Sequence, residues 1–416
     1  MDQICKPTEC TGCSACYNAC GCCAISMIEN NEGFLKPQIN QDKCVDCGRC
    51  VKVCPANNDL PLYLPTESFA CHAKDVEEQL TSSSGGVASM ISRVFIENDG
   101  VVYGCMMSTG YKAYHTRVDK LKDIDQLKGS KYVQSNIGTI YRDVRKDLMN
   151  DKRVLFIGTP CQVSGLKFYL SKEYDNLYTL DFVCHGVPSQ RILDGAISSL
   201  SKSHNLDGTR LQFRFKEQHK KSVDHIFCKG ADAKSREYKS IFSLHFVDGQ
   251  GTVRYSERYP FSKYITGYLT ALFYRESCYV CRYAVPKRIS DLTCGDFMES
   301  EIEKLLPGGH RKISMLCVNT IKGKYLFESV KNSLEVISVD YSKVVECHNQ
   351  LHHPMPRNPK RQVFMDSFVS YGFEEAMNVS FKKELENNIR HYYKQLIKYY
   401  LMKIPGFSKI YKCWNK

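Results

Sequence analysis

The cysteines are the residues of this sequence whose types and spacing could do chemistry. The pattern C-x2-C-x2-C-x3-C occurs twice, at Cys10, Cys13, Cys16 and Cys20 and again at Cys44, Cys47, Cys50 and Cys54. Three closely spaced cysteines on a tight loop can face three corners of an iron–sulfur cubane, while a fourth, displaced along the chain, reaches a second cubane. We therefore assign one [4Fe–4S] cluster to Cys10, Cys13, Cys16 and Cys54, and a second to Cys44, Cys47, Cys50 and Cys20.

Zinc ribbons also use paired C-x2-C motifs and are the alternative to two clusters. Zinc takes four ligands, so eight cysteines in an ordered double run suit two cubanes better. The first run departs from the usual pattern, because Gly21 stands where a proline normally follows the fourth cysteine. Cys5, Cys22 and Cys23 could compete as ligands, but we favour their interpretation as small packed residues.

The composition sets the background for these motifs. The chain has 416 residues with 22 cysteines and 43% hydrophobic residues, which indicates a globular protein that can bury a core without disulfides. A surplus of thiols then favours metal or redox chemistry in a reducing compartment. The beginning of the sequence lacks a basic segment followed by an apolar one, and no later run is apolar for long enough to cross a bilayer. We expect a cytoplasmic protein.

The elements that must position the motifs divide the chain into four parts. We expect a ferredoxin domain over residues 1–58, a proline-containing linker over 59–66, a larger domain over 67–355 and a basic helical tail over 356–416. Apolar runs at Val154–Ile157 and Leu177–Val183 are each followed by a loop and a helical pattern. This alternation predicts an α+β ferredoxin module followed by an α/β domain with a mostly parallel sheet. The alternating, aromatic-rich residues 210–260 suggest antiparallel strands or an insertion.

Two loops of the larger domain could bind an anionic cofactor. Ser83, Ser84, Gly85 and Gly86 open a predicted helix near Val87 and could present hydroxyl and backbone N–H groups to a phosphate, with Lys131 adding a charge. A second loop, at Gly158, Thr159 and Pro160, follows a predicted strand, at the sheet edge that ligands favour in parallel sheets. An ordinary serine cap with glycines serving the turn is the alternative for the first loop, and a proline-terminated turn is the alternative for the second.

Four further cysteines suggest a third cluster. They are Cys161, Cys184, Cys278 and Cys281. The first two lie at strand ends that we expect to be neighbours, and the last two form a C-x2-C pair. Two buried thiols beside an unrelated C-x2-C pair remain the alternative, and Cys294 competes for a ligand place. His185 could protonate a substrate nearby, although a loop histidine bonded to backbone is the simpler interpretation.

Several stretches, taken together, resemble a known family. They are residues 81–86, 129–135, 158–162, 184–189, 278–281 and 290–297. In this order and behind a two-cluster ferredoxin module, they resemble the beta subunit family of coenzyme F-420 hydrogenase and dehydrogenase over roughly residues 5–355. The resemblance implies FAD in the larger domain and an oxidoreductase passing electrons between [4Fe–4S] clusters, FAD and a small organic substrate. An electron-transfer subunit without its own substrate, docking on a catalytic partner, is the alternative.

The resemblance and the basic tail also suggest partners. No G-x-G-x-x-G follows a predicted strand, so we expect electrons from a ferredoxin or another redox partner protein rather than from a nicotinamide. From Phe381 onward the chain has nine Lys or Arg against two Glu, and a helix there would place Leu385, Ile389, Tyr392, Leu396 and Tyr400 on one face. Such a helix could adsorb to the inner face of an anionic membrane, or it could pack on the larger domain. Nothing else suggests nucleic acid as a partner.

Overall fold

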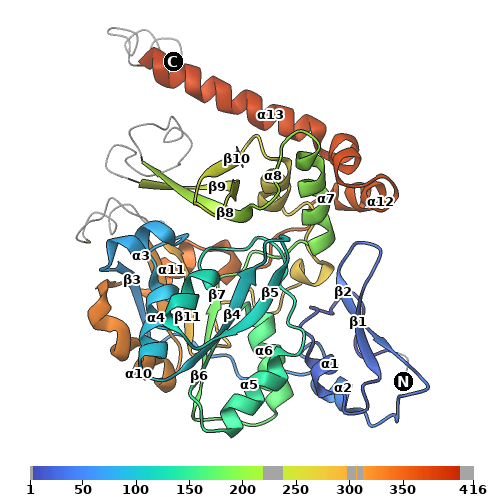
Figure 1. Cartoon of the computed structure of the whole chain (residues 1–416), viewed down its shortest axis with the longest axis vertical. Helices are drawn as coiled ribbons and strands as arrows, with labels where there is room; N and C mark the ends of the chain where they lie inside the picture. Colours follow the sequence, from blue (N-terminus) through green and yellow to red (C-terminus); the bar gives the residue numbers. More distant parts are fainter. Residues whose placement is uncertain (1–2, 219–237, 298–305, 307–312, 403–416) are drawn as a thin grey trace.

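The computed structural model describes residues 3–218, 238–297, 306 and 313–402 (Figure 1). The N-terminal module has two short helices, α1 (Ala15–Ala19) and α2 (Arg49–Lys52), and an antiparallel hairpin of β1 (Ile25–Glu29) and β2 (Leu35–Ile39). Gly12 and Gly48 adopt positive φ angles of 67° and 69°, which lets each cysteine run turn tightly before its helix begins.

An eight-stranded sheet forms the centre of the larger domain. In spatial order its strands are β13 (Leu334–Ser338), β3 (Glu67–Ala73), β12 (Ile313–Val318), β11 (Leu292–Phe297), β7 (Leu177–Phe182), β6 (Val154–Gly158), β4 (Val101–Met107) and β5 (Ala113–Val118). The four neighbours β11, β7, β6 and β4 are parallel, and β3 runs in the same direction. The ladders of β12, β13 and β5 are antiparallel. The predicted α/β domain with a mostly parallel sheet is therefore confirmed.

Helices cover both faces of this sheet because alternate strand residues point in opposite directions. In β6, Leu155 and Ile157 join the core under α4 (Val87–Glu97) and α10 (Ile321–Val330). Val154 and Phe156 instead join the core under α5 (Ile140–Met149) and α6 (Pro160–Leu170). The shorter helices are α3 (Val76–Thr81), η1 (Leu121–Leu127), η4 (Glu276–Cys278), η5 (Lys331–Ser333), α11 (Tyr341–Glu346) and η6 (Asn349–Leu351).

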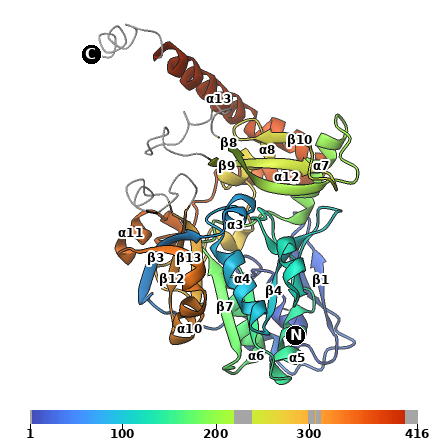
Figure 2. The same cartoon turned by 60° about the vertical axis from the view of Figure 1, so that its left-hand side comes forward.

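A second, smaller layer lies beyond one end of the large sheet (Figure 2). It contains the antiparallel strands β8 (Arg210–Gln218), β9 (Tyr238–Val247) and β10 (Val253–Arg258), so the antiparallel strands expected over residues 210–260 are confirmed. Four helices pack with them in one aromatic-rich core: α7 (Gln190–Ser201), α8 (Lys263–Leu269), α12 (Arg361–Tyr371) and the start of α13 (Phe373–Met402). Within the described ranges, no helix is long and apolar enough to cross a membrane.

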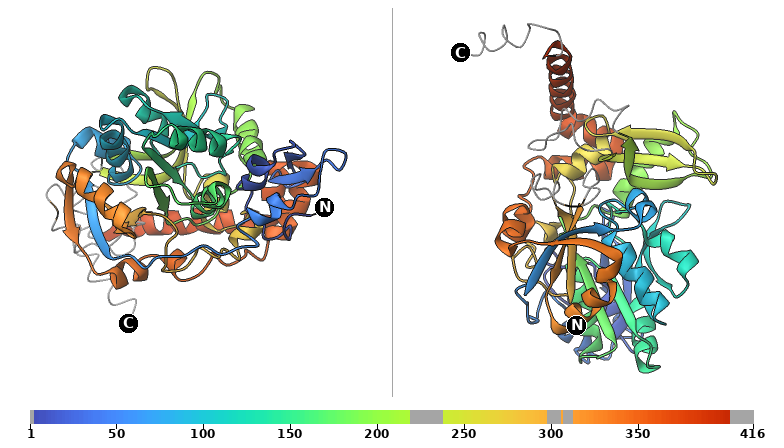
Figure 3. Two further views of the ribbon diagram at one scale, coloured as in Figure 1. Left: turned by 90° about the horizontal axis from the view of Figure 1, so that it is seen from below. Right: turned by 90° about the vertical axis from the view of Figure 1, so that its left-hand side faces the viewer.

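The ferredoxin module lies against α5 and α6, on the side of the large domain opposite β3 (Figure 3, left). The Arg142 guanidinium on α5 donates to the carbonyls of Tyr17 and Asn18, at 3.0 and 3.1 Å. The Asn18 amide donates in return to the Gly138 carbonyl at 2.8 Å. These bonds, with the apolar core shared by α1, α5 and α6, fix the cysteine runs relative to the sheet.

Candidate redox site

The first predicted set of cysteines lines one cavity in the ferredoxin module. Cys10, Cys13, Cys16 and Cys54 all lie on its wall, as does Cys5. Cys54 joins the others because the chain after α2 returns to the loop that contains Cys10. The four predicted ligands thus line one small space together with Cys5, which fits a [4Fe–4S] cluster at this place.

The second predicted set lies nearer the surface. Cys50 interacts electrostatically with Cys47 and Cys20, while the Cys44 thiol lies 3.7 Å from a carboxylate oxygen of Asp46. The Cys47 side chain is exposed. The Cys20 sulfur also accepts from the Ala24 amide at 3.2 Å, the kind of bond that tunes cluster sulfurs.

A single metal ion is the alternative occupant of these sites. Within the described parts of the chain, no three His, Cys, Asp or Glu side chains are grouped as one metal ion requires. The Sγ atoms of Cys20 and Cys22 do approach to 3.6 Å, but they form a pair rather than a tetrahedral set.

The four cysteines proposed for a third cluster come together at one edge of the large sheet. Cys161 is the second residue of α6, Cys184 follows β7, and Cys278 and Cys281 lie at and just after η4. Their thiols all interact electrostatically with one another. Burial raises the pKa of Cys161 to about 11 and that of Cys278 to about 12, so metal binding here would release protons. Cys294, the competitor, is buried within β11 and interacts instead with Cys71 and Cys317.

The first and third cysteine sets are neighbours. A Cβ atom at Gly165 on α6 would lie 2.9 Å from the Cys13 sulfur, so the two elements touch there. Cys13 also interacts electrostatically with Cys161, which lies one turn earlier on the same helix. The buried guanidinium of Arg275 faces thiols of both sets. The first and third cysteine sets therefore lie on adjoining elements.

The predicted phosphate loop meets the loop that contains Lys131. Ser83 Oγ accepts from the Ser130 amide at 2.8 Å, and the Lys131 ammonium donates to the carbonyls of Leu127 and Lys128, at 2.8 and 2.9 Å. Burial lowers the pKa of Lys131, and none of these partners carries a negative charge. A part-buried ammonium beside a serine-rich loop fits an anionic group such as a diphosphate.

The other members of this loop have clear roles in packing. Ser84 Oγ donates to the Ile313 carbonyl at 3.0 Å, and the Gly85 amide donates to Ser314 Oγ, also at 3.0 Å. A Cβ at Gly85 would lie only 2.8 Å from the Cys71 carbonyl oxygen. Gly86 has a φ of 82° at the start of α4. Phosphate binding by Ser83, Ser84, Gly85 and Gly86 stays a prediction.

Gly158, Thr159 and Pro160 form the junction between β6 and α6. Thr159 and Gln162 make a capping box, with the Thr159 amide donating to Gln162 Oε1 at 3.1 Å. The Gln162 amide then donates to Ser135 Oγ at 2.9 Å, and Ser135 Oγ hydrogen-bonds to His115 Nδ1 at 3.0 Å. These buried hydrogen bonds connect the helix turn that contains Cys161 to the loop over residues 129–135.

His185 lies where strands of the large sheet end beneath the small sheet. It interacts electrostatically with His348, Asp296 and Arg214, and the guanidinium of Arg214 donates to Asp296 Oδ2 at 2.8 Å. Surrounding protein atoms desolvate the imidazole, although part of it stays open to solvent, and this lowers the pKa of His185 to about 4. His185 is therefore neutral near pH 7, which suits a hydrogen-bond partner or proton acceptor better than a donor.

Sequence reasoning missed three residues near these thiols. The first is Gln134, whose Nε2 donates to the Thr11 carbonyl at 2.8 Å and whose oxygen accepts from Arg275. The second is Arg275 itself, and the third is Gln162, which forms the hydrogen bond to Ser135 described above. The two glutamines lie inside the stretches 129–135 and 158–162, so proximity to the motifs was a usable signal. Nothing local marked Arg275 apart from its position three residues before Cys278.

Two models of known protein families match parts of the chain. Residues 151–342 match the family model that describes the C terminus of the coenzyme F420 hydrogenase/dehydrogenase beta subunit. Residues 9–58 match a 4Fe-4S dicluster domain. None of the curated proteins compared with the chain matches it.

The solved structures that match the chain include one of low similarity. It is a chain of the xenon-derivatized F420-reducing [NiFe] hydrogenase complex from Methanosarcina barkeri, with 12% sequence identity and a TM-score of 0.41. The similarity covers 77% of this chain and 93% of that chain. The chain is thus similar over residues 151–342 to the C terminus of the coenzyme F420 hydrogenase/dehydrogenase beta subunit, behind a 4Fe-4S dicluster domain at residues 9–58.

Proposed function

We propose that the chain is an iron–sulfur flavoprotein oxidoreductase that moves electrons between [4Fe–4S] clusters, FAD and a small organic substrate. The observation that carries the proposal is the convergence of Cys161, Cys184, Cys278 and Cys281 beside the first ferredoxin site. A third cluster there would continue a path from the exposed second site, through the first, to the sheet edge. Without a third cluster, the electron path would stop at the first site, inside the protein, and would not reach this edge.

Residues around that edge suit a flavin and a substrate. In our proposal Lys131 and the Ser83–Ser130 contact hold the diphosphate of FAD, and bound FAD supplies the exchange between one-electron and two-electron chemistry. Tyr132, which packs against Phe242 at 5.5 Å and Tyr268 at 4.5 Å between ring centroids, excludes water beneath the small sheet. His185 hydrogen-bonds the substrate as a neutral imidazole.

Anaerobic purification with iron, sulfide and flavin analysis tests this function. The expected result is iron and acid-labile sulfide for three clusters, with FAD released on denaturation. Iron for two clusters and no flavin would remove the basis for the larger domain's role. The purified chain should then be offered chemical reductants and candidate substrates, because turnover without another protein distinguishes an enzyme from a carrier.

An electron-transfer subunit without its own substrate is the second candidate. The exposed face of the second cysteine set favours it, since Cys47 is exposed and the neighbouring Val45 side chain is 70% exposed. An apolar, accessible surface beside a cluster suits docking of a ferredoxin or a catalytic partner. Electron delivery to a partner without substrate turnover by the chain alone would support this candidate instead.

We also propose that the distal part of α13 adsorbs to an anionic membrane. Tyr393, Ile397 and Tyr400 are 50, 57 and 51% exposed and recur at helical spacing on one face. Arg390, Lys394 and Lys398 are exposed beside them. An apolar stripe next to a basic one is the pattern of interfacial helices.

A further inference from the structure

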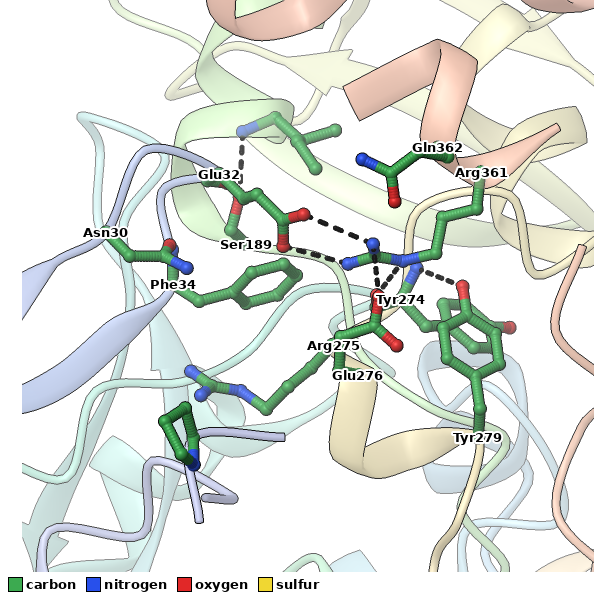
Figure 4. Close-up of polar contacts among 12 residues, drawn as sticks. Asn30, Glu32, Phe34, Ser189, Tyr274, Arg275, Glu276, Tyr279, Arg361 and Gln362 are labelled. Carbon is green, nitrogen blue, oxygen red and sulfur yellow. Dashed lines mark hydrogen bonds and ion pairs between the residues drawn. The ribbon is translucent and has the colours of Figure 1, made fainter. Parts of the chain in front are cut away.

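Arg275 is a buried cation with no carboxylate among the partners that the structure gives it. Its side chain is 1% exposed. The guanidinium donates to Gln134 Oε1 at 2.9 and 2.7 Å, to the Cys10 carbonyl at 3.2 Å and to the Leu35 carbonyl at 3.1 Å. It also lies over the Phe34 ring, 4.8 Å from the centroid (Figure 4). Neutral partners satisfy its hydrogen bonds but leave its charge uncompensated.

Arg361 offers a contrast within the same interface. It is 0% exposed and donates to both carboxylate oxygens of Glu32, at 3.1 and 2.8 Å. It also pairs with Glu276 at 2.5 Å (Figure 4). Arg361 therefore ties the hairpin of the ferredoxin module to α12 as a neutralised ion pair, whereas Arg275 needs its counter-charge from elsewhere.

The groups of negative potential around Arg275 are cysteines of two cluster sites. It interacts electrostatically with Cys10 and Cys13 of the first set and with Cys278 and Cys161 of the third. A cluster held by four thiolates carries net negative charge, and each added electron makes that charge larger. Lys36 also faces Cys10, but it is only half-buried and Glu32 faces it in turn.

We propose that Arg275 is a positioning residue that raises the reduction potentials of the first and third clusters above that of the second. A buried cation stabilises the reduced, more negative form of a cluster more than the oxidised form, and the low dielectric of the interior strengthens this effect. Arg275 contacts both sets directly, because its guanidinium donates to the Cys10 carbonyl and its own carbonyl accepts from the Cys278 amide at 2.9 Å, and its strongest electrostatic interactions are with cysteines of these two sets. Electrons entering at the exposed second cluster would then run inward. The effect of Arg275 on the third cluster rests on the proposed function, whereas its effect on the first cluster requires only the dicluster domain.

The test is an anaerobic redox titration followed by electron paramagnetic resonance on four forms of the holoprotein. These are the parent chain, Arg275→Met, Arg275→Lys and the matched control Arg361→Met. A Cys47→Ser variant, which loses the second cluster, assigns the signals. We expect Arg275→Met to shift the first-cluster potential to a more negative value while the second stays in place. Arg275→Lys should retain most of the parent potential, because it keeps the charge.

The control separates charge from packing. Arg361→Met should lower the thermal unfolding temperature without shifting either potential. An unshifted first cluster in Arg275→Met, an equal shift of both ferredoxin clusters, or the same shift in Arg361→Met would overturn the inference. If Arg275→Met does not retain its clusters, Arg275→Gln, which can keep the bond to Gln134, takes its place under the same criteria. Iron analysis separates the two proposals, since a two-cluster protein should still show the first-cluster shift.

Discussion

At the scale of single residues, Cys13 of the first cysteine set lies against Gly165 of α6, the helix that also contains Cys161. A Cβ at Gly165 would lie 2.9 Å from both Cβ and Sγ of Cys13 and 3.0 Å from the Tyr141 hydroxyl. All three neighbours are held, because Cys13 and Tyr141 are buried and the Tyr141 hydroxyl donates to the Gln162 carbonyl at 2.7 Å. Any side chain at Gly165 therefore displaces Cys13, which we propose as a ligand of the first cluster.

Gly165→Ala should weaken the first cluster although alanine favours helix formation. Overpacking of this kind costs about 1–3 kcal/mol, which exceeds the gain of about 1 kcal/mol from replacing a helical glycine. The expected result is a lower unfolding temperature and loss of iron during anaerobic gel filtration. Gly21→Ala is the matched control, because no atom lies within 4 Å of its added Cβ. Equal iron retention in the two variants would contradict the contact.

His115 should make stability depend on pH. Burial lowers the pKa of His115 to about 4 from 6.5, so the unfolded chain takes up a proton first as the pH falls. The stabilisation is thus complete above 6.5 and is lost toward 4. His115→Gln should be less stable at neutral pH, since Ser135 loses a partner. It should also lose less stability than the parent between about pH 7 and pH 5. Urea unfolding at several pH values measures both effects. If the free energy of unfolding depended on pH equally in the parent and in His115→Gln, the prediction would be wrong.

At the scale of elements, local pattern located the central strands but not their flanking partners. The apolar runs Val154–Ile157 and Leu177–Val183 became β6 and β7 almost unchanged, because buried parallel strands are marked by continuous apolar residues. The strand β3 lies between β12 and β13, whose residues come more than 200 positions later. No local periodicity encodes such a partner, and for the same reason the contact of Arg275 with Cys10 could not be foreseen.

The predicted apolar face of helix α13 is buried at some positions and exposed at others. Of the face predicted to be apolar, Leu385 and Tyr392 are buried, whereas Tyr400 is 51% exposed. The distal part of α13, which contains Tyr400, extends past the small sheet (Figure 1). The tail is thus a packed helix near its start and an exposed amphipathic one farther on.

Replacing Tyr393, Ile397 and Tyr400 together with serine should abolish binding to anionic lipid vesicles. The exposed stripe supplies apolar contact, and each nearby lysine contributes on the order of 1 kcal/mol at low salt. Cosedimentation with vesicles containing phosphatidylserine measures the binding, and cluster spectra should stay unchanged. Tyr371→Ser is the control, since Tyr371 is 76% exposed on α12 outside the stripe. Undiminished cosedimentation of the triple variant would exclude the membrane role.

At the scale of the whole molecule, the three cysteine sets differ in their burial. The second set is exposed at Cys47, the first is enclosed between α1 and α6, and the third lies at the sheet edge under the small layer. Hydrogen bonds fix the ferredoxin module against the rest of the protein, and their donors are Arg142, Gln134 and Arg361. A fixed module favours electron transfer along one route over transfer by a module that swings.

Removing the third set should interrupt this route without dismantling its beginning. In a Cys278→Ala, Cys281→Ala double variant, we expect iron and sulfide to fall by the content of one cluster while the two ferredoxin signals remain. Electrons from dithionite should still reduce the ferredoxin clusters, but turnover of any substrate identified for the parent should fall by orders of magnitude. Cys347→Ala is the matched control, because Cys347 lies after α11 and belongs to none of the three sets. Iron content equal to that of the parent would show that Cys278 and Cys281 hold no cluster, and the path would then end at the first site.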